Sequence, residues 1–284
     1  MEPDQRVIYS IIKKHIKGAG KEGCSLIESL DLKTKEVISL VGAGGKTTLM
    51  FRLARELLLT GKKVVTTTTT KILEPSSEET PCLFVHSDEE KLRQLALHHI
   101  SQFGHITLVR DRLDSGKLDG ISPDLVALLS KSSEIDTVII EADGAAGRPV
   151  KAPREWEPVI PSVTTLVIGL LGMDGVGKEL NEENHFQAER ISQLTGIPMG
   201  EGMTCEGMAI LMVHPQGIFK GASHSSKRIP FINKVDVPGG MIKGREIGKQ
   251  ILGKRSPNIE RVVLGQLKSE LPVAEVMFPS NERR

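Results

Sequence analysis

Short apolar runs alternate with longer amphipathic segments along most of this chain. Buried strands are predicted at residues 37–41, 62–68, 105–109, 136–141, 164–170 and 229–233. Helical spacing of apolar residues follows at 47–60, 88–101, 122–131, 184–195 and 239–253, and a last short strand is expected at 260–264. This alternation predicts an α/β fold with a mostly parallel sheet covered by helices on both faces.

The ends of the chain read differently from its centre. Apolar residues at helical spacing between positions 5 and 17 predict a leading helix outside the sheet. We therefore divide the chain into an N-terminal helical extension (1–35), a core domain (36–240), and a C-terminal helix and strand packing on the core (241–284). The segment 196–228 has no clear pattern, and the tail from Ser280 is expected to fray.

The strongest chemical signal follows the first strand. Residues 42–48 read Gly-Ala-Gly-Gly-Lys-Thr-Thr and lead into a helix. Glycines let backbone N–H groups approach phosphate oxygens closely, and a helix N-terminus adds the positive end of its dipole. This loop predicts a P-loop NTPase-like three-layer fold with nucleotide-binding residues Gly42, Ala43, Gly44, Gly45, Lys46, Thr47 and Thr48.

Two side chains of this loop have predicted roles. Lys46 is a candidate catalytic residue because it can reach the outer phosphates, and Thr47 can place its hydroxyl on Mg²⁺. The usual outer glycine would fall at Leu40, so the loop is the shorter G-x-x-G-K-T form. The alternative is a glycine-rich turn that binds nothing, but the order of strand, loop, Lys-Thr and helix argues against it.

Acidic residues stand at the tip of the strand 136–141. An acid beside a phosphate loop holds Mg²⁺ or its water shell, so Glu141 and Asp143 are candidate metal ligands, and Asp143 is also a catalytic candidate. A solvated turn is the alternative. A flexible loop is expected next, in which Arg148 or Lys151 would neutralise charge on a transferred phosphate, with Lys151 as the catalytic candidate.

The strand 229–233 runs into Asn233-Lys234-Val235-Asp236, an N-K-x-D tetrapeptide. In GTPases this motif reads guanine, with the aspartate accepting from the ring N–H and amino groups and the lysine packing along the base. A carboxylate there repels the acceptor on the edge of adenine. We assign Asn233, Lys234 and Asp236 to base recognition and leave GTP and ATP open as the nucleotide.

Three further patterns have weaker readings. Thr66–Thr70 either face the phosphates or form an ordinary strand exit. The loop 172–178 lacks a hydroxyl residue after Lys178, so we interpret it as a loop presenting Asp174 toward the site. Neither His185 nor His214 has metal-ligand spacing with another His or Cys.

Composition excludes several classes of protein. Lys and Arg number 37 against 36 Asp and Glu, and aromatic residues make up 3%, so neither a basic field nor a stacking surface for nucleic acid is expected. No apolar run is long enough to span a membrane. The three cysteines are far apart and the N-terminus has no signal-peptide pattern, so we expect a cytoplasmic protein.

The ordered set of motifs resembles the YqeC family, described as selenium-dependent hydroxylase accessory proteins or selenium cofactor biosynthesis proteins. The resemblance covers about residues 36–240, through the segments 41–48, 67–72, 141–144, 148–153, 172–174 and 231–236. It implies a P-loop nucleotide-binding protein that helps mature selenium-containing molybdenum hydroxylases. The family's His-Arg-Pro-Glu stretch is replaced by residues 185–189, which leaves His185 and Glu189 as candidate ligand contacts.

Three functions remain open. The first is a Mg²⁺-dependent GTPase or ATPase whose loops at 66–71 and 143–153 switch a partner surface, the partner being a selenium-dependent molybdenum hydroxylase or its cofactor. The second is a Mur-type ATP-dependent ligase or a kinase, suggested by the short loop, although no carbamylated-lysine region or large C-terminal ligase domain is evident. The third is a non-catalytic scaffold for a nucleotide-bearing molybdopterin cofactor.

Overall fold

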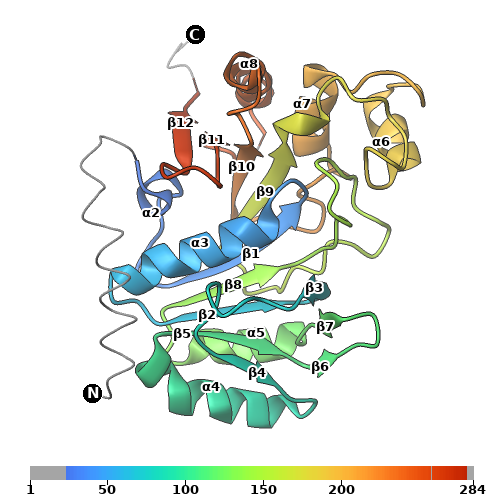
Figure 1. Cartoon of the computed structure of the whole chain (residues 1–284). Coiled ribbons are helices and arrows are strands. Elements are labelled where there is room, and N and C mark those ends of the chain that lie inside the picture. Colours follow the sequence, from blue (N-terminus) through green and yellow to red (C-terminus); the bar gives the residue numbers. More distant parts are fainter. Residues whose placement is uncertain (1–23, 257, 280–284) are drawn as a thin grey trace.

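The structure is a computed structural model and describes residues 24–256 and 258–279 (Figure 1). The predicted leading helix at 5–17 and the predicted fraying of the tail from Ser280 lie outside the described residues. The boundary drawn at residue 35 falls in the turn between α2 (Leu26–Ser29) and the first strand.

One nine-stranded sheet forms the centre of the molecule, in the order β12-β11-β10-β9-β1-β8-β2-β5-β4. Every neighbouring pair is parallel except β11 and β12, so the predicted α/β fold with a mostly parallel sheet is confirmed. The strands are β1 (Glu36–Gly42), β2 (Val64–Thr68), β4 (Leu83–Val85), β5 (His105–Val109), β8 (Thr137–Glu141), β9 (Leu166–Gly172), β10 (Lys227–Asn233), β11 (Val262–Gly265) and β12 (Val273–Met277).

The central strand β1 sets the position of the site. All seven of its residues are buried, as expected for a strand covered on both faces. Ile38 and Leu40 pack into the core on one face of the sheet, whereas Val37 and Val41 pack into the core on the other. The parallel register pairs Leu40 with Glu141 of β8, which brings the end of β1 beside the predicted acidic residues.

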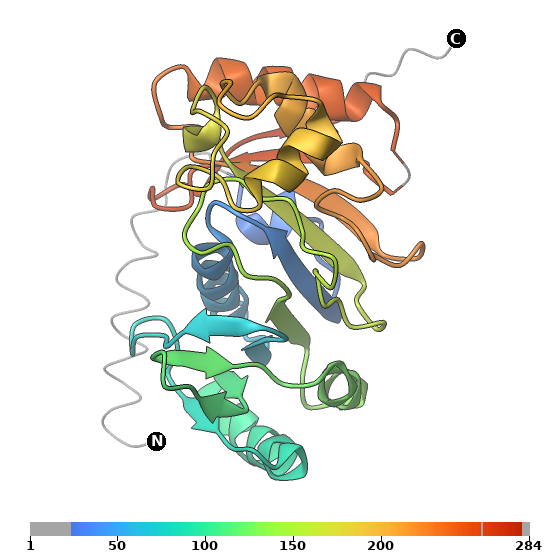
Figure 2. The same cartoon turned by 90° about the vertical axis from the view of Figure 1, so that its right-hand side faces the viewer.

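Helices cover both faces of the sheet. The helices α2 and α3 (Lys46–Leu59) contribute to one core, and the helices of the other core are α4 (Glu89–Phe103), α5 (Pro123–Lys131), α6 (Ala188–Thr195), α7 (Cys205–Val213) and α8 (Gly240–Gly253). Figures 1 and 2 show α4 at one end of the sheet and α7 and α8 at the other. Within the described part of the chain, no helix has the length and apolar character needed to cross a membrane.

Several elements differ from the sequence-based predictions. A separate three-stranded sheet consists of β3 (Lys71–Leu73), β7 (Lys117–Asp119) and β6 (Asp111–Arg112), and β4 and β12 were also not predicted. Strands of two or three residues are too short to show periodicity. The helix predicted at 184–195 begins only at Ala188, because Gln187 has a left-handed backbone, and the unassigned segment 196–228 contains α7.

A buried histidine in β5 makes folding stability depend on pH. His105 is 2% exposed, with Nε2 2.9 Å from the hydroxyl oxygen of Thr66. Burial lowers the pKa of His105 from 6.5 to about 4. The unfolded chain therefore binds this proton more tightly than the folded one, so the contribution of His105 is complete above pH 6.5 and is lost as the pH falls toward 4.

We predict that this single group lowers the free energy of unfolding by about 3 kcal/mol between about pH 7 and pH 4. Urea unfolding of the wild type and of His105→Gln at several pH values measures the effect. The difference between the two proteins removes contributions from other titrating groups, and it should grow steadily across this window. Parallel pH profiles for the two proteins would contradict the assignment.

Candidate functional site

The glycine-rich loop connects β1 to α3 at the carboxyl edge of the sheet. Gly44 and Gly45 have φ values of 83° and 135°, which L side chains rarely adopt. A Cβ on Gly44 would overlap the backbone nitrogen of Gly172, and one on Gly45 would overlap Nδ2 of Asn233. Glycine is therefore required at both positions by the backbone conformation and by the neighbouring loops.

Backbone N–H groups of this loop fall into two sets. The N–H of Gly42 donates to Asp143 Oδ2 (3.0 Å), and that of Ala43 donates to Leu170 O (2.9 Å). In contrast, the N–H groups of residues 44–48 have no acceptor within residues 24–256 and 258–279. Consecutive unpaired N–H groups at a helix N-terminus form a concave anion-binding site, so their arrangement fits the phosphates of a nucleotide.

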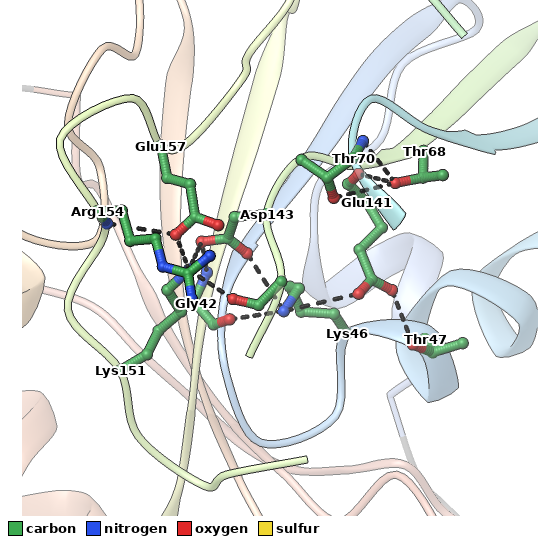
Figure 3. A network of polar contacts seen from close by, with 11 residues as sticks. Gly42, Lys46, Thr47, Thr68, Thr70, Glu141, Asp143, Lys151, Arg154 and Glu157 are labelled. Carbon is green, nitrogen blue, oxygen red and sulfur yellow. Dashed lines mark hydrogen bonds and ion pairs between the residues drawn. The ribbon is translucent and has the colours of Figure 1, made fainter. Parts of the chain in front are cut away.

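Lys46 is buried among acceptors (Figure 3). Its Nζ lies 2.6 Å from Gly42 O, 3.2 Å from Asp143 Oδ1 and 3.7 Å from Glu141 Oε1. Burial by itself would lower the pKa of Lys46, but the carboxylates of Asp143 and Glu141 outweigh it, and the pKa is raised. The ammonium is therefore kept charged inside the protein by two acids.

Thr47 and Glu141 form a hydrogen-bonded pair beside Lys46. The Thr47 hydroxyl donates to Glu141 Oε2 at 2.7 Å. Burial raises the pKa of Glu141, against the opposing effects of the Lys46 ammonium and the Thr47 hydrogen bond. Thr48 is half-buried in the first turn of α3. A hydroxyl and a carboxylate side by side at the end of a phosphate loop are ligands of the type that Mg²⁺ takes together with phosphate oxygens.

Asp143 joins the loop to a buried lysine. Lys151 Nζ lies 3.1 Å from Asp143 Oδ2, 2.7 Å from Glu157 Oε2 and 2.6 Å from Gly144 O. Lys151 is fully buried, so its ammonium faces these acceptors in the interior, and its predicted role at a transferred phosphate stays a prediction. The flanking Gly and Pro residues suggested flexibility, whereas the two carboxylates that hold Lys151 in place become neighbours only in the fold.

Glu157 is a site residue that sequence reasoning missed. It is 6% exposed and lies in a loop, outside any motif that we recognised. Arg148, the other predicted cation of this region, is half-buried, and its Nε donates to Glu182 O rather than to the phosphate loop. The spacing of Lys151 and Glu157 carries no signal by itself, because it corresponds to no helix or strand period.

The N-K-x-D segment lies at the end of β10, beside the phosphate loop. Asn233 Nδ2 donates to Gly44 O at 2.7 Å, so this side chain is brought to the loop rather than left for a base. Lys234 Nζ lies 2.6 Å from Asp174 Oδ2, which places the loop after β9 next to this motif. Asp236 is exposed, with its carboxylate open to solvent.

Thr67, Thr68 and His185 lie within the protein's own hydrogen-bond network, whereas Glu189 is exposed. The Thr67 hydroxyl donates to Leu108 O, and the Thr68 hydroxyl donates to Glu141 O, both at 2.7 Å, as an ordinary strand exit would require. His185 is fully buried with Nε2 3.3 Å from Gly175 O, and burial lowers its pKa. Among the described residues, no group of three or more His, Cys, Asp or Glu could hold a metal ion alone.

The mostly parallel sheet and the glycine-rich loop between β1 and α3 place this protein in the class of P-loop NTPase-like, nucleotide-binding folds. The YqeC protein family matches residues 38–189. A curated relative from Escherichia coli (strain K12), described as uncharacterized protein YqeC, is 32% identical over 244 residues, which cover 85% of this chain and 91% of the relative. The chain therefore belongs to the YqeC family.

Two solved structures are also similar to this chain. The signal recognition particle 54 kDa protein from Aeropyrum pernix K1, in complex with GDP, has a TM-score of 0.37 and 15% identity over 98% of this chain and 52% of that one. The receptor FtsY from Elizabethkingia anophelis has a TM-score of 0.35 and 16% identity over 86% of this chain and 62% of that one. This chain spans less than two thirds of the length of either.

We predict that Gly44→Ala destabilises the protein more than Gly61→Ala. Both glycines have φ 83°, so both substitutions carry the backbone cost of about 1–2 kcal/mol. Gly61 has open space around the added methyl, whereas Gly44 faces Gly172, which adds about 1–3 kcal/mol of overpacking. Chemical denaturation of the two variants measures the difference, and equal losses would show that the loop is not packed as described.

Proposed function

We propose that this protein binds a nucleoside triphosphate with Mg²⁺ at residues 42–48 and hydrolyses it as a switch in the maturation of another enzyme. The observation that carries the proposal is the row of N–H groups at residues 44–48, which have no acceptor in the described part of the chain and belong to the same turn as the buried Lys46. Five N–H donors and a cation in one concave turn suit the oxygens of a polyphosphate better than they suit any neutral ligand.

Each side chain of the site has a role in this proposal. Lys46 exchanges Gly42 O for an outer phosphate oxygen, a movement within its own side chain. Thr47 and Glu141, already paired, would hold Mg²⁺ directly or through its water shell. When bound, Mg²⁺ would neutralise charge between the outer phosphates. Asp143 stands beside Lys46, where it can orient a water molecule for attack.

Lys151 has a different role from Lys46 in this proposal. Lys151 contacts Asp143 and Glu157 and is fully buried, so we assign it a positioning role rather than direct contact with phosphate. It would hold the Asp143 carboxylate in place when Lys46 turns to the ligand. Charge neutralisation on the transferred phosphate then falls to Lys46 and the backbone N–H groups.

Guanine is the preferred base in this proposal. The Asp236 carboxylate is open to solvent after the strand β10, where it can accept hydrogen bonds from the ring and amino N–H groups of guanine. Asn233 fastens the same segment to Gly44 and so sets its distance from the phosphate loop. Adenine would present a ring acceptor to the carboxylate and bind more weakly.

The maturation role rests on family membership together with this site. The partner in the proposal is a selenium-dependent molybdenum hydroxylase or its cofactor, and the protein would act in the cytoplasm. The loop 143–157 carries both the contact to Lys46 and two surface-exposed residues, Glu155 and Trp156, so it is the segment through which nucleotide state would reach a partner.

We predict that Lys46→Ala weakens GTP binding in the presence of Mg²⁺ by about tenfold to a hundredfold, the effect of losing one charge-assisted contact. Isothermal titration calorimetry measures the affinity, and Lys91→Ala, an exposed lysine on α4, is the matched control. Binding by the wild type should disappear when Mg²⁺ is chelated. Unchanged affinity in Lys46→Ala would refute the site, and bound GTP without phosphate release would refute hydrolysis.

A second substitution tests the base. Asp236→Asn should weaken GTP by about a hundredfold, because guanine loses two hydrogen bonds to a charged acceptor, and should change ATP by less than about threefold. The exposed residue Asp114, replaced by Asn, serves as the control for a lost surface charge. Equal losses for GTP and ATP, or tight ATP binding by the wild type without GTP binding, would overturn the guanine assignment.

A further inference from the structure

A second concave region lies between the loop after β8 and the helix α6. It is an open hollow of about 770 Å³, within the range of small-molecule binding sites. Its lining includes Arg154, Glu155, Trp156, Gln187, Glu189 and Arg190. None of these residues belongs to the phosphate loop or to the N-K-x-D segment, so the nucleotide site leaves this hollow without a role.

Trp156 gives the hollow an aromatic surface. It is the only tryptophan of the chain and is 70% exposed. The guanidinium carbon of Arg154 lies 5.7 Å from its ring centre, so the two planar groups stand together at the rim. An exposed indole beside a hollow of this size offers a stacking face to a planar ligand.

Two arginines of the hollow are available to an anion. Among the described residues, neither Arg154 nor Arg190 has a carboxylate within ion-pair distance. The Nε of Arg190 is also buried without an acceptor within that part of the chain. Guanidinium groups bind phosphate and carboxylate in a planar, two-pronged geometry, so an anionic group on the ligand would satisfy these donors.

Three glutamates line the hollow beside the two arginines, so a ligand there must offer N–H donors as well as an anionic group. The Glu182 carboxylate, at the same place, already accepts the backbone N–H groups of Ala188 (2.7 Å) and Gln187 (3.3 Å) at the start of α6. Glu155 and Glu189 are exposed and offer acceptors for N–H donors. The ligand that fits these features is a planar nitrogen heterocycle that carries an anionic group. Its ring would stack on the indole, its anionic group would bind the guanidinium groups, and its N–H groups would donate to the glutamates.

A continuous series of contacts joins the hollow to the phosphate loop (Figure 3). Glu157 Oε2 accepts the backbone N–H of Arg154 at 3.2 Å and lies 2.7 Å from Lys151 Nζ. Lys151 in turn lies 3.1 Å from Asp143, which contacts Lys46. The cations of Arg154 and Lys151 also lie 4.8 Å and 5.4 Å from the centre of the Phe186 ring.

We propose that the hollow binds a planar nitrogen heterocycle bearing a phosphate or carboxylate, and that Lys151 and Glu157 couple its binding to the nucleotide at the phosphate loop. Loss of Lys46 from Asp143 on nucleotide binding would strengthen the pull of Asp143 on Lys151, and Lys151 shares Glu157 with the backbone of Arg154. The coupling rests on the proposed function, whereas binding in the hollow does not.

The full chain without nucleotide provides the first test, with uridine monophosphate and orotate as probes. The two have the same pyrimidine ring with N–H donors and differ in carrying a phosphate or a carboxylate. Because Trp156 is the only tryptophan, its emission reports on the hollow directly. We expect a saturable change with one probe, which identifies the anion, and an affinity at least about tenfold weaker in Arg190→Gln.

The control for this titration is Arg93→Gln, which removes an arginine from the distant helix α4 and should leave the affinity unchanged. The site would be overturned if neither probe gave a saturable change up to about 10 mM, a concentration that corresponds to a binding free energy of only about 3 kcal/mol. Equal affinities for the wild type and Arg190→Gln would do the same, since binding would then lie elsewhere.

Coupling is tested by repeating the titration with saturating GTP and Mg²⁺. The wild type should show a change in probe affinity of at least about fivefold, and the probe should change GTP affinity by the same factor. In Glu157→Gln the factor should fall below about twofold while both ligands still bind. Phe186→Leu, which removes the ring between Lys151 and Arg154, tests the same connection should Glu157→Gln fail to fold.

The outcomes separate the two proposals. Probe binding that is insensitive to GTP, with GTP binding itself present in calorimetry, overturns the coupling. Absence of both GTP and ATP binding in calorimetry refutes the proposed function and leaves the nucleotide-free titration as an independent measure of the hollow.

Discussion

The buried carboxylate of Asp143 is the interaction on which the rest of the site depends. It is 1% exposed and receives the N–H of Gly42, the ammonium of Lys46 and the ammonium of Lys151. A buried charge without such partners would cost several kcal/mol. Moving any of the three donors away from the carboxylate would therefore destabilise the fold. In consequence the end of β1, the first turn of α3 and the loop that carries Lys151 have one mutually fixed arrangement.

The order of the parallel strands brings the residues of the site together at the carboxyl edge of the sheet. The strands β8 and β9 flank β1, and β10 lies next to β9, all parallel, so their carboxyl ends meet. Asp143, Gly172 and Asn233 therefore come from three separate strand ends to surround one loop. Open parallel sheets place ligands in this position because loops from neighbouring strands converge there. Glycine at position 44 then lets the loop after β9 pack directly against the phosphate loop.

The sequence predicted the long elements and the residues at the strand ends, because apolar runs and a glycine-rich turn are local signals. It missed β3, β4, β6 and β7, which are too short for a periodic pattern, and it also missed β12. It started α6 too early because the left-handed Gln187 has no sequence signature. Partnerships across the fold were also beyond it. No local pattern indicates that the carboxylates of Asp143 and Glu157 hold Lys151 in the interior, and the hydrogen bond from Asn233 to Gly44 joins residues 189 positions apart.

The charge balance of the buried cluster explains why nucleotide and metal ion belong together in the proposed function. Two lysines, Lys46 and Lys151, face three carboxylates, those of Glu141, Asp143 and Glu157, so the cluster carries an excess of negative charge if all are ionised. Burial raises the pKa of Glu141, which is the response expected of the acid that is least compensated. A polyphosphate alone would add like charge beside it, whereas Mg²⁺ at Thr47 and Glu141 would supply the missing positive charge. In the proposed function, Glu141 would pair with the metal ion, Lys46 would turn toward phosphate, and Asp143 would keep Lys151 and the N–H of Gly42 as its partners. That change would strengthen the attraction between Asp143 and Lys151, and because Lys151 also contacts Glu157, it would be felt by a residue away from the phosphate loop.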